Sequence, residues 1–297
     1  MSTACPRDLL PQHNLNSKFK KRGVTRHLFL YLESIMEYTD PARKARFDRL
    51  CREAMRTRPL SDDSGIGTLG EKRMHAIIKR YLCEDEAYHE QTVPGTRFVS
   101  DIRIGTDAYE VQTGPFYPMK KKIEYYLSST DYTVTVVHPI PAVRWMSWVD
   151  PVTMEIAPRK RVTRSGRAED LLPELYSLLS CLPNERLHFH LFFLETHDFR
   201  LLNGRTKSRK VKASHYERIP LSLLGEAEFH SPEDFRTFVP EELPERFTAR
   251  DFATLTRLRG IDSYSAIRVL AALGLVTPTE KIGRSMAWEK TKAPSDQ

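Results

Sequence analysis

The chain has few cysteines and no long hydrophobic run. Its four cysteines (Cys5, Cys51, Cys83 and Cys181) form no Cys-x-x-Cys pair. That pattern argues against zinc binding and a disulfide scaffold, and it favours a reducing compartment. No stretch reaches the ~18 apolar residues of a membrane-spanning helix, and the opening MSTACPRDLLPQHNLN lacks the apolar centre of a secretory signal. We therefore expect a cytoplasmic protein with no membrane partner.

The charge balance favours a polyanionic partner. The 297 residues carry 46 Lys and Arg against 39 Asp and Glu, a formal net charge of +7, and they are enough for two domains. Two basic runs contain no acid: one between Glu155 and Glu169, and one between Asp198 and Glu217. Either these runs line a groove that binds the phosphate backbone of a nucleic acid, or they are ordinary solvated loops.

A short hairpin places two carboxylates opposite each other. Residues 98–104 and 107–113 read as strands joined by the two-residue turn Gly105-Thr106. Counting back from this turn puts Asp101 directly opposite Glu110. Opposed carboxylates repel, and a bound Mg²⁺ or Mn²⁺ is the usual compensation. The hairpin is therefore a candidate metal site.

A helix precedes the hairpin. Residues 68–83 place Met74, Ile77, Ile78, Tyr81 and Leu82 on one stripe at helical spacing. Glu71 lies at the edge of this stripe, where a carboxylate is costly to bury without a partner. It is either a third acid of the same site or a first-turn residue that favours the helix dipole.

The order of these pieces resembles the PD-(D/E)xK nuclease superfamily, which includes restriction endonucleases and Holliday-junction resolvases. The matching residues are Glu71 on a helix, Ser100-Asp101, Glu110-Val111-Gln112, the basic helix FYPMKKKIEYYL and the apolar strand YTVTVVHPI, across roughly residues 66–140. The resemblance implies an α/β fold: a restriction-endonuclease-like αβββαβ core with a mixed sheet. The chain is also similar to an uncharacterised bacterial group that pairs such a core with a C-terminal winged helix.

The resemblance implies a Mg²⁺-dependent deoxyribonuclease. Asp101 and Glu110 would hold Mg²⁺ or Mn²⁺ with the carbonyl of Val111, helped by Glu71, and the cation would activate water for attack on a phosphodiester. Gln112 stands where the family usually has Lys; it can position water but supplies no positive charge. The triplet Lys120, Lys121 and Lys122 either supplies that charge or is a solvated helix face that touches backbone phosphates.

The C-terminal segment resembles a winged helix-turn-helix. Thr248 caps a first helix, Gly260 breaks it, Ser263–Leu273 forms a recognition helix, and Gly274 ends it. A strand from Leu275-Val276, a wing turn at residues 281–284 and a returning strand at 286–288 follow. The alternative is a winged helix used only for protein contacts. The expected DNA-contacting residues are Ser263, Tyr264, Ser265, Arg268 and, in the wing, Arg284.

We expect four segments and three alternative functions. The segments are a basic helical extension (1–60, with residues 1–22 disordered and a helix over 24–57 broken at Pro41), the nuclease-like domain (61–225), a linker (226–246) and the winged helix (247–297). The first alternative is a nuclease acting on DNA, or else on RNA. The second is a DNA-binding regulator that uses an inactive core as a scaffold, and the third is an assembly protein. Relatives in the superfamily often act as dimers, so a homodimer is a further expectation.

Overall fold

The structure is a computed structural model that describes residues 40–57, 69–204 and 213–292. All of them belong to one compact unit. The prediction for residues 1–22 falls outside the described residues. The predicted helix over 24–57 is described only as a helix beginning at Pro41.

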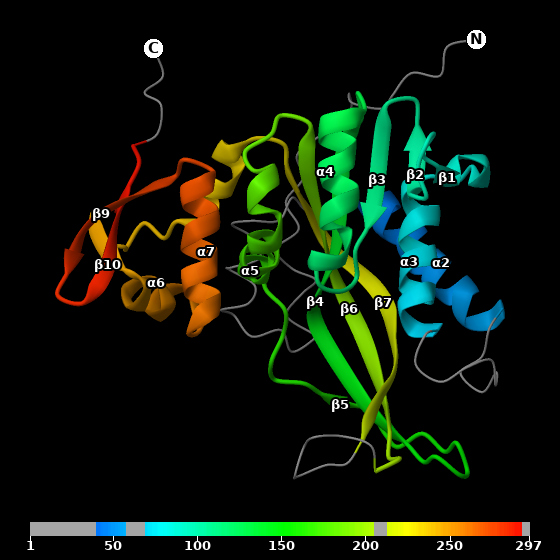
Figure 1. Cartoon of the computed structure of the whole chain (residues 1–297). Coiled ribbons are helices and arrows are strands. Elements are labelled where there is room, and N and C mark those ends of the chain that lie inside the picture. Colours follow the sequence, from blue (N-terminus) through cyan, green and yellow to red (C-terminus); the bar gives the residue numbers. More distant parts are fainter. Residues whose placement is uncertain (1–39, 58–68, 205–212, 293–297) are drawn as a thin grey trace. The chain divides into compact units, whose positions relative to one another are not determined.

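The protein has an α/β fold with a mixed sheet of seven strands and a second sheet of three (Figure 1). The helices are α2 (Pro41–Thr57), α3 (Leu69–Leu82), α4 (Lys120–Ser129), α5 (Leu171–Leu175), α6 (Ala249–Thr256) and α7 (Ile261–Ala272). The strands are β1 (His89–Thr92), β2 (Val99–Ile104), β3 (Asp107–Val111), β4 (Thr133–Val149), β5 (Lys160–Arg161), β6 (Leu187–Leu201), β7 (Ser214–Phe229), β8 (Arg246–Thr248), β9 (Val276–Ile282) and β10 (Ser285–Lys290).

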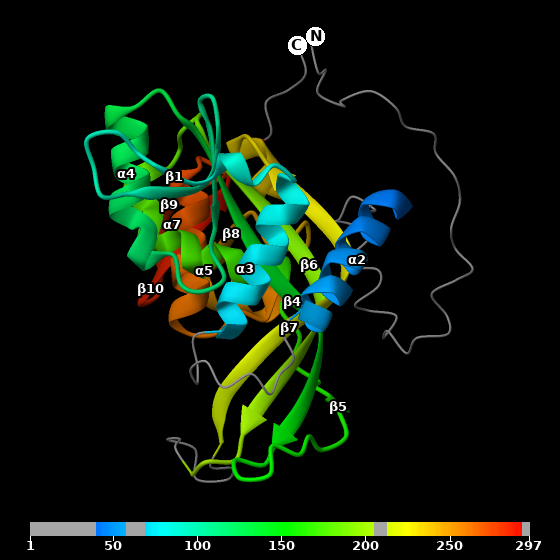
Figure 2. The same ribbon diagram turned by 90° about the vertical axis from the view of Figure 1, so that its right-hand side faces the viewer.

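The large sheet runs in the order β1-β2-β3-β4-β6-β7, with β5 added to β4. Strand β4 is parallel to both β3 and β6, and the remaining pairs are antiparallel. The parallel step from β3 to β4 needs a crossover, which α4 provides. Figure 2 shows α2 and α3 on one side of the sheet and α4 and α5 on the other.

Each face of the sheet has its own apolar packing. On the side of α2 and α3, the rings of Phe47 and Tyr81 meet edge to face at 5.3 Å, and Tyr81 meets Phe192 of β6 at 5.5 Å. Met74, Ile77, Ile78 and Tyr81 are buried in this cluster, as the helical stripe predicts. On the side of α4, Ile123 and Tyr126 are fully buried.

Strand β4 continues through two prolines, Pro139 and Pro141. Its pairing with β3 ends at Val111↔Val137, and the Val137 carbonyl accepts a hydrogen bond from Gln112 N–H at 2.9 Å. By strand alternation, the N–H positions of Pro139 and Pro141 face the side that β3 has left, so no ladder bond is lost there. A bulge follows between Pro141 and Val143.

Strands β4, β6 and β7 run past the helices as a three-stranded extension, at the bottom of Figure 1. We call it the arm: residues 144–149, 196–201 and 214–219. Val149, Phe199, Leu201 and Ile219 form a small apolar cluster within it. Within the arm, the fully buried Asp198 binds two guanidinium groups, those of Arg144 and Arg218.

The C-terminal elements follow the predicted order. The Thr248 hydroxyl donates to the Asp251 carboxylate (2.8 Å) in a capping box that starts α6, and Gly274, with φ +77°, follows α7. Helix α6 ends at Thr256 before Arg257 in the left-handed region, three residues earlier than predicted. The hairpin β9–β10 turns at Gly283, and β8 adds a third strand.

The predicted linker 226–246 is ordered and partly buried. It contains the end of β7 and a 3₁₀ helix, Pro232–Phe238, in which Phe235 and Phe238 are buried against Phe229. Among the described residues, no helix is long and apolar enough to cross a membrane.

Candidate functional site

Three carboxylates lie in one row across neighbouring strands. The hairpin register is as predicted, with Ile104 opposite Asp107 and Ile102 opposite Tyr109, and its continuation places Asp101 opposite Glu110. On the other side of β2, His89 pairs with Ile102 and Gln91 with Ser100, which places Glu90 opposite Asp101. The row Glu90–Asp101–Glu110 therefore follows from strand register.

Asp101 is held by a helix and by the neighbouring strand. One of its oxygens, Oδ2, lies 2.9 Å from His75 Nε2 on α3 and accepts the Val111 N–H at 2.7 Å. Burial alone would raise the pKa of Asp101, but the His75 hydrogen bond and charge, the Val111 N–H and Lys122 together lower it below its ordinary value. Asp101 is therefore an ionised carboxylate at neutral pH.

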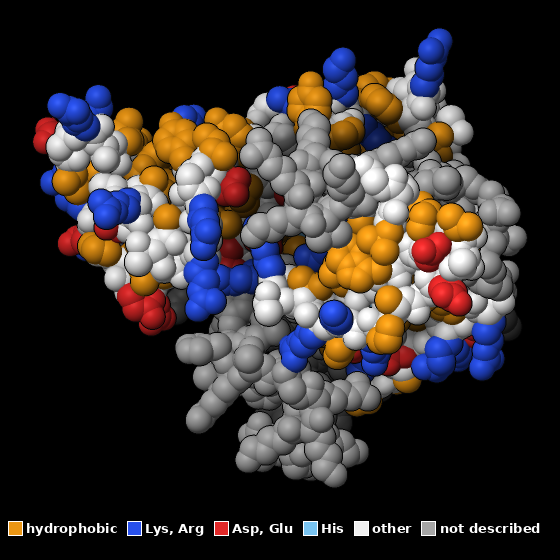
Figure 3. Space-filling view, turned by 90° about the horizontal axis from the view of Figure 1, so that it is seen from below, with side chains coloured by type: hydrophobic (Ala, Val, Ile, Leu, Met, Phe, Trp, Pro, Cys, Tyr) orange, Lys and Arg blue, Asp and Glu red, His pale blue; other side chains and the backbone are white. Residues whose placement is uncertain are grey.

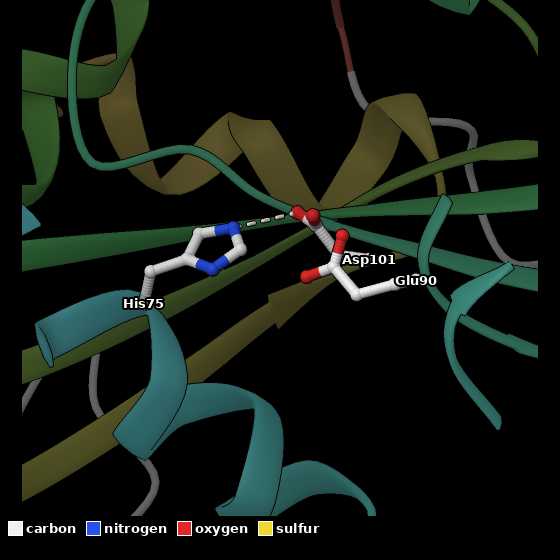
Figure 4. A group of neighbouring side chains, drawn as sticks. All are labelled: His75, Glu90 and Asp101. Atoms are coloured by element: carbon white, nitrogen blue, oxygen red, sulfur yellow. Dashed lines mark hydrogen bonds and ion pairs between the residues drawn. The ribbon is translucent and has the colours of Figure 1, made fainter. Parts of the chain in front are cut away.

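Glu90 completes a group of possible metal ligands (Figure 4). One donor atom each of His75, Glu90 and Asp101 lies within 4.8 Å of the others. Glu90 has φ +51°, a conformation uncommon outside glycine, and its carboxylate pairs with Lys79 of α3. Helix α3 therefore contributes both an imidazole and a cation to this end of the row.

Glu110 is buried between two side chains of α4. Lys122 Nζ donates to one of its oxygens and also to the Val99 carbonyl (2.5 Å), and the Tyr126 hydroxyl donates to the other oxygen at 2.8 Å. Burial raises the pKa of Glu110 to about 7; Asp101 adds to the rise, and Lys122 and Tyr126 oppose it. The pKa of Tyr126 is raised by burial and by Glu110.

Each acid in the row has a cationic or imidazole partner from the chain itself. Lys79 pairs with Glu90, His75 with Asp101 and Lys122 with Glu110. The repulsion expected between opposed carboxylates is therefore offset in part without a bound cation. The expectation that a bound Mg²⁺ or Mn²⁺ supplies the rest of this compensation stays a prediction.

The other predicted catalytic residues are placed differently. Gln112 lies just past β3, its side-chain amide donates to the Pro115 carbonyl at 2.6 Å, and its backbone carbonyl lies 2.6 Å from His138 Nδ1. Burial lowers the pKa of His138 to about 4, so that the imidazole is neutral. The side chain of Glu71 lies outside the described residues.

Of the Lys triplet, Lys122 alone is bound to the acidic row. Lys120 lies 3.7 Å from Glu124 on the same helix, and Lys121 is exposed. Position on α4 decides this, since Lys122 lies one helical turn before Tyr126, which also contacts Glu110.

Two of the predicted DNA-contacting residues are buried. Ser263 and Ser265 are 2% and 7% exposed, because this face of α7 packs against neighbouring elements, and their assignment to the major groove is wrong. Arg268 and Arg284 are exposed, and Tyr264 is half-buried. Lys and Arg side chains also occupy several separate places on the face seen from below (Figure 3), so positive charge is not confined to the C-terminal elements.

His75, Glu90 and Tyr126 were missed by sequence reasoning. The signal for His75 was its position four residues after Glu71, which places both on one helix face. Glu90 had no such signal, because HEQT is a short polar strand. Tyr126 follows Lys122 by four residues, but only the contact of α4 with β3 assigns it to Glu110.

The donor set suits a divalent cation. One imidazole nitrogen and two carboxylates favour Mn²⁺ or another first-row cation over Mg²⁺, which prefers oxygen ligands throughout.

Comparison with known proteins identifies a domain family. No curated protein and no solved structure matches the chain. The domain family described as Domain of unknown function (DUF8091) matches residues 72–230, which include every residue of the acidic row and the whole of β4 and β6. The chain belongs to the DUF8091 family.

Proposed function

We propose that the chain is a divalent-cation-dependent nuclease that hydrolyses phosphodiester bonds of DNA on a PD-(D/E)xK-like core. The observation that carries the proposal is the row Glu90–Asp101–Glu110, with His75 at one side and Lys122 at the other. The order α3-β1-β2-β3-α4-β4, with β3 parallel to β4, supports it, because an αβββαβ core has this order.

In this proposal, His75, Glu90 and Asp101 hold the cation. Their donor atoms already lie within 4.8 Å of one another, and Asp101 is ionised at neutral pH. The bound cation supplies positive charge at the phosphate and makes a bound water more acidic. The Val111 N–H fixes the Asp101 carboxylate, so that the site is preorganised by β3.

Glu110 accepts the proton that water loses, and Lys122 offsets the negative charge on the phosphate. With a pKa of about 7, Glu110 is suited to accept a proton at neutral pH. The water oxygen bonds to phosphorus, the bond to the leaving oxygen breaks, and the proton lost by water passes to Glu110. Lys122 supplies the positive charge that Gln112 lacks.

The C-terminal elements α6, α7, β9 and β10 serve as a winged helix that binds DNA. Arg268 is exposed on α7 and lies with its guanidinium 3.4 Å from the Tyr264 hydroxyl, and Arg284 is exposed in the turn of the β9–β10 hairpin. Because Ser263 and Ser265 are buried, contact with DNA is limited to the narrow stripe that carries Tyr264 and Arg268.

The alternative is a catalytically inactive, DNA-binding regulator. It is favoured by the pairing of every acid with a group of the chain, which stabilises the row without a cation. It is also favoured by Gln112, whose amide closes the loop to Pro115.

The deciding experiment is cleavage of plasmid and single-stranded DNA with Mg²⁺ or Mn²⁺. The nuclease predicts cleavage by the natural chain that is lost in Asp101→Ala and Glu110→Ala. Lys122→Ala is expected to lower the rate about 10²–10³-fold, as for loss of one group that stabilises transition-state charge. Lys121→Ala, on the same helix turn, is the matched control. No cleavage by the natural chain, together with salt-sensitive DNA binding, would establish the regulator instead.

A further inference from the structure

A basic strip, residues 157–166, lies along the edge of β4 beside residues 141–148, most of which belong to the arm. Beyond Val137, β3 no longer covers this edge. Residues 157–166 take its place in the opposite direction, with Ala157 N–H donating to the Trp148 carbonyl, Val162 N–H to Arg144 and Gly166 N–H to Pro141, each at 2.9 Å. These backbone bonds fix the strip to the sheet.

The basic side chains of the strip are exposed to solvent. Arg159, Lys160, Arg161 and Arg164 are all exposed, and the run has no acid. The guanidinium of Arg159 stacks on the Trp145 ring at 4.5 Å, which orients it. Within the described part of the chain, Lys160 and the Arg164 side chain form no ion pair. Their charge is therefore available to an outside anion.

Strand β4 sets the spacing between the strip and the acidic row. Glu110 and Val111 lie beside Val136 and Val137, and Arg161 lies beside Trp145. The eight residue steps from Val137 to Trp145 span about 26 Å at ~3.3 Å per residue. A DNA duplex rises ~3.4 Å per base pair, so that this distance corresponds to about 8 base pairs.

We propose that Arg159, Lys160, Arg161 and Arg164 bind the backbone of a DNA duplex about 8 base pairs from the phosphate at the acidic row. This deepens the proposed function and rests on it: the substrate is duplex DNA that extends past the cut along β4. Phosphate binding by such side chains is independent of sequence and depends steeply on salt.

The test uses the triple variant Arg159→Gln, Lys160→Gln and Arg164→Gln in the full chain. The control, Arg49→Gln, Arg52→Gln and Arg56→Gln, removes the same charge from exposed positions of α2. Binding to duplexes of ~6 and ~18 base pairs is measured over a salt series with Asp101→Asn present throughout, so that no DNA is cut. Each lost phosphate contact lowers the slope of log affinity against log salt by about 0.9.

On the long duplex, the triple variant should show a slope of log affinity against log salt that is smaller in magnitude by about 2–3. The slope should not change on the short duplex, and the α2 control should leave it unchanged on both duplexes. Equal slopes for the triple variant and its parent would overturn the proposal. So would an equal loss of slope in the α2 control. If the natural chain does not cleave DNA, the proposed nuclease is refuted. The binding measurement still tests the strip, because it does not depend on cleavage.

Discussion

Glu110 gives the sharpest prediction, because its burial makes the stability of the fold depend on pH. Its pKa is 4.5 ordinarily and about 7 in the folded protein. The folded state therefore binds the proton more tightly than the unfolded state. The stability associated with the protonated carboxyl is fully present below pH 4.5, and it is lost as the pH rises to 7.

The size of this effect follows from the two pKa values. Their difference of about 2.5, at about 1.4 kcal/mol for each pKa unit, gives a cost of about 3 kcal/mol to the folded state above pH 7. Glu110→Gln removes the ionisation. Compared with the natural chain, the variant should therefore gain about 3 kcal/mol in free energy of unfolding between pH 4 and pH 8.

The assay is urea unfolding of both chains at pH 4, 6 and 8, in EDTA to exclude metal ions. Glu124→Gln is the control, because Glu124 lies on the same helix with a side chain 41% exposed. The difference in free energy of unfolding between this variant and the natural chain should be the same at all three pH values. For Glu110→Gln, the difference in free energy of unfolding from the natural chain should change with pH. A change of less than about 1 kcal/mol between pH 4 and pH 8 would refute the assignment of a raised pKa to Glu110.

Three further predictions follow from the geometry. His75→Ala should weaken Mn²⁺ binding more than about tenfold by calorimetry, because it removes the only nitrogen donor of the group, whereas the exposed His230→Ala should not. Arg268→Ala should lower DNA affinity and reduce the salt slope by about 1, with cleavage chemistry untouched, whereas Ser265→Ala should leave affinity unchanged because that side chain is buried. Asp198→Ala should destabilise the fold by about 3–5 kcal/mol in urea unfolding, because two guanidinium groups lose their buried partner.

Each of these has a contrary outcome. Unchanged Mn²⁺ affinity in His75→Ala would remove the imidazole from the site, and unchanged DNA affinity in Arg268→Ala would end the proposed role of α7. An Asp198→Ala chain as stable as its parent would show that the arm does not depend on its ion pairs.

Local chemistry was enough to predict the hairpin. The two-residue turn at Gly105 sets the register, so Asp101 and Glu110 could be placed opposite each other from the sequence alone. The same holds for the buried stripe of α3, the capping box at Thr248 and the glycine after α7. Each of these depends on residues a few positions apart.

Tertiary structure decided which side chains reach the acidic row. The spacing of Lys120, Lys121 and Lys122 could not choose among them; the contact of α4 with β3 selected Lys122. The burial of Ser263 and Ser265 depends on what packs against α7, which the amphipathic pattern of that helix alone does not reveal.

Strand β4 shows the same division. Proline removes a ladder donor and is therefore disfavoured inside a paired strand, yet β4 contains Pro139 and Pro141. The structure continues the strand, since β3 stops at Val111 and the missing donors face a side with no partner from β3. The sequence by itself determined the turns, the caps and the order of the elements, because these depend on neighbouring residues. Only the tertiary structure decided where β3 ends, which cation meets each acid and how the basic strip lies on β4, because each of these depends on contacts between distant segments.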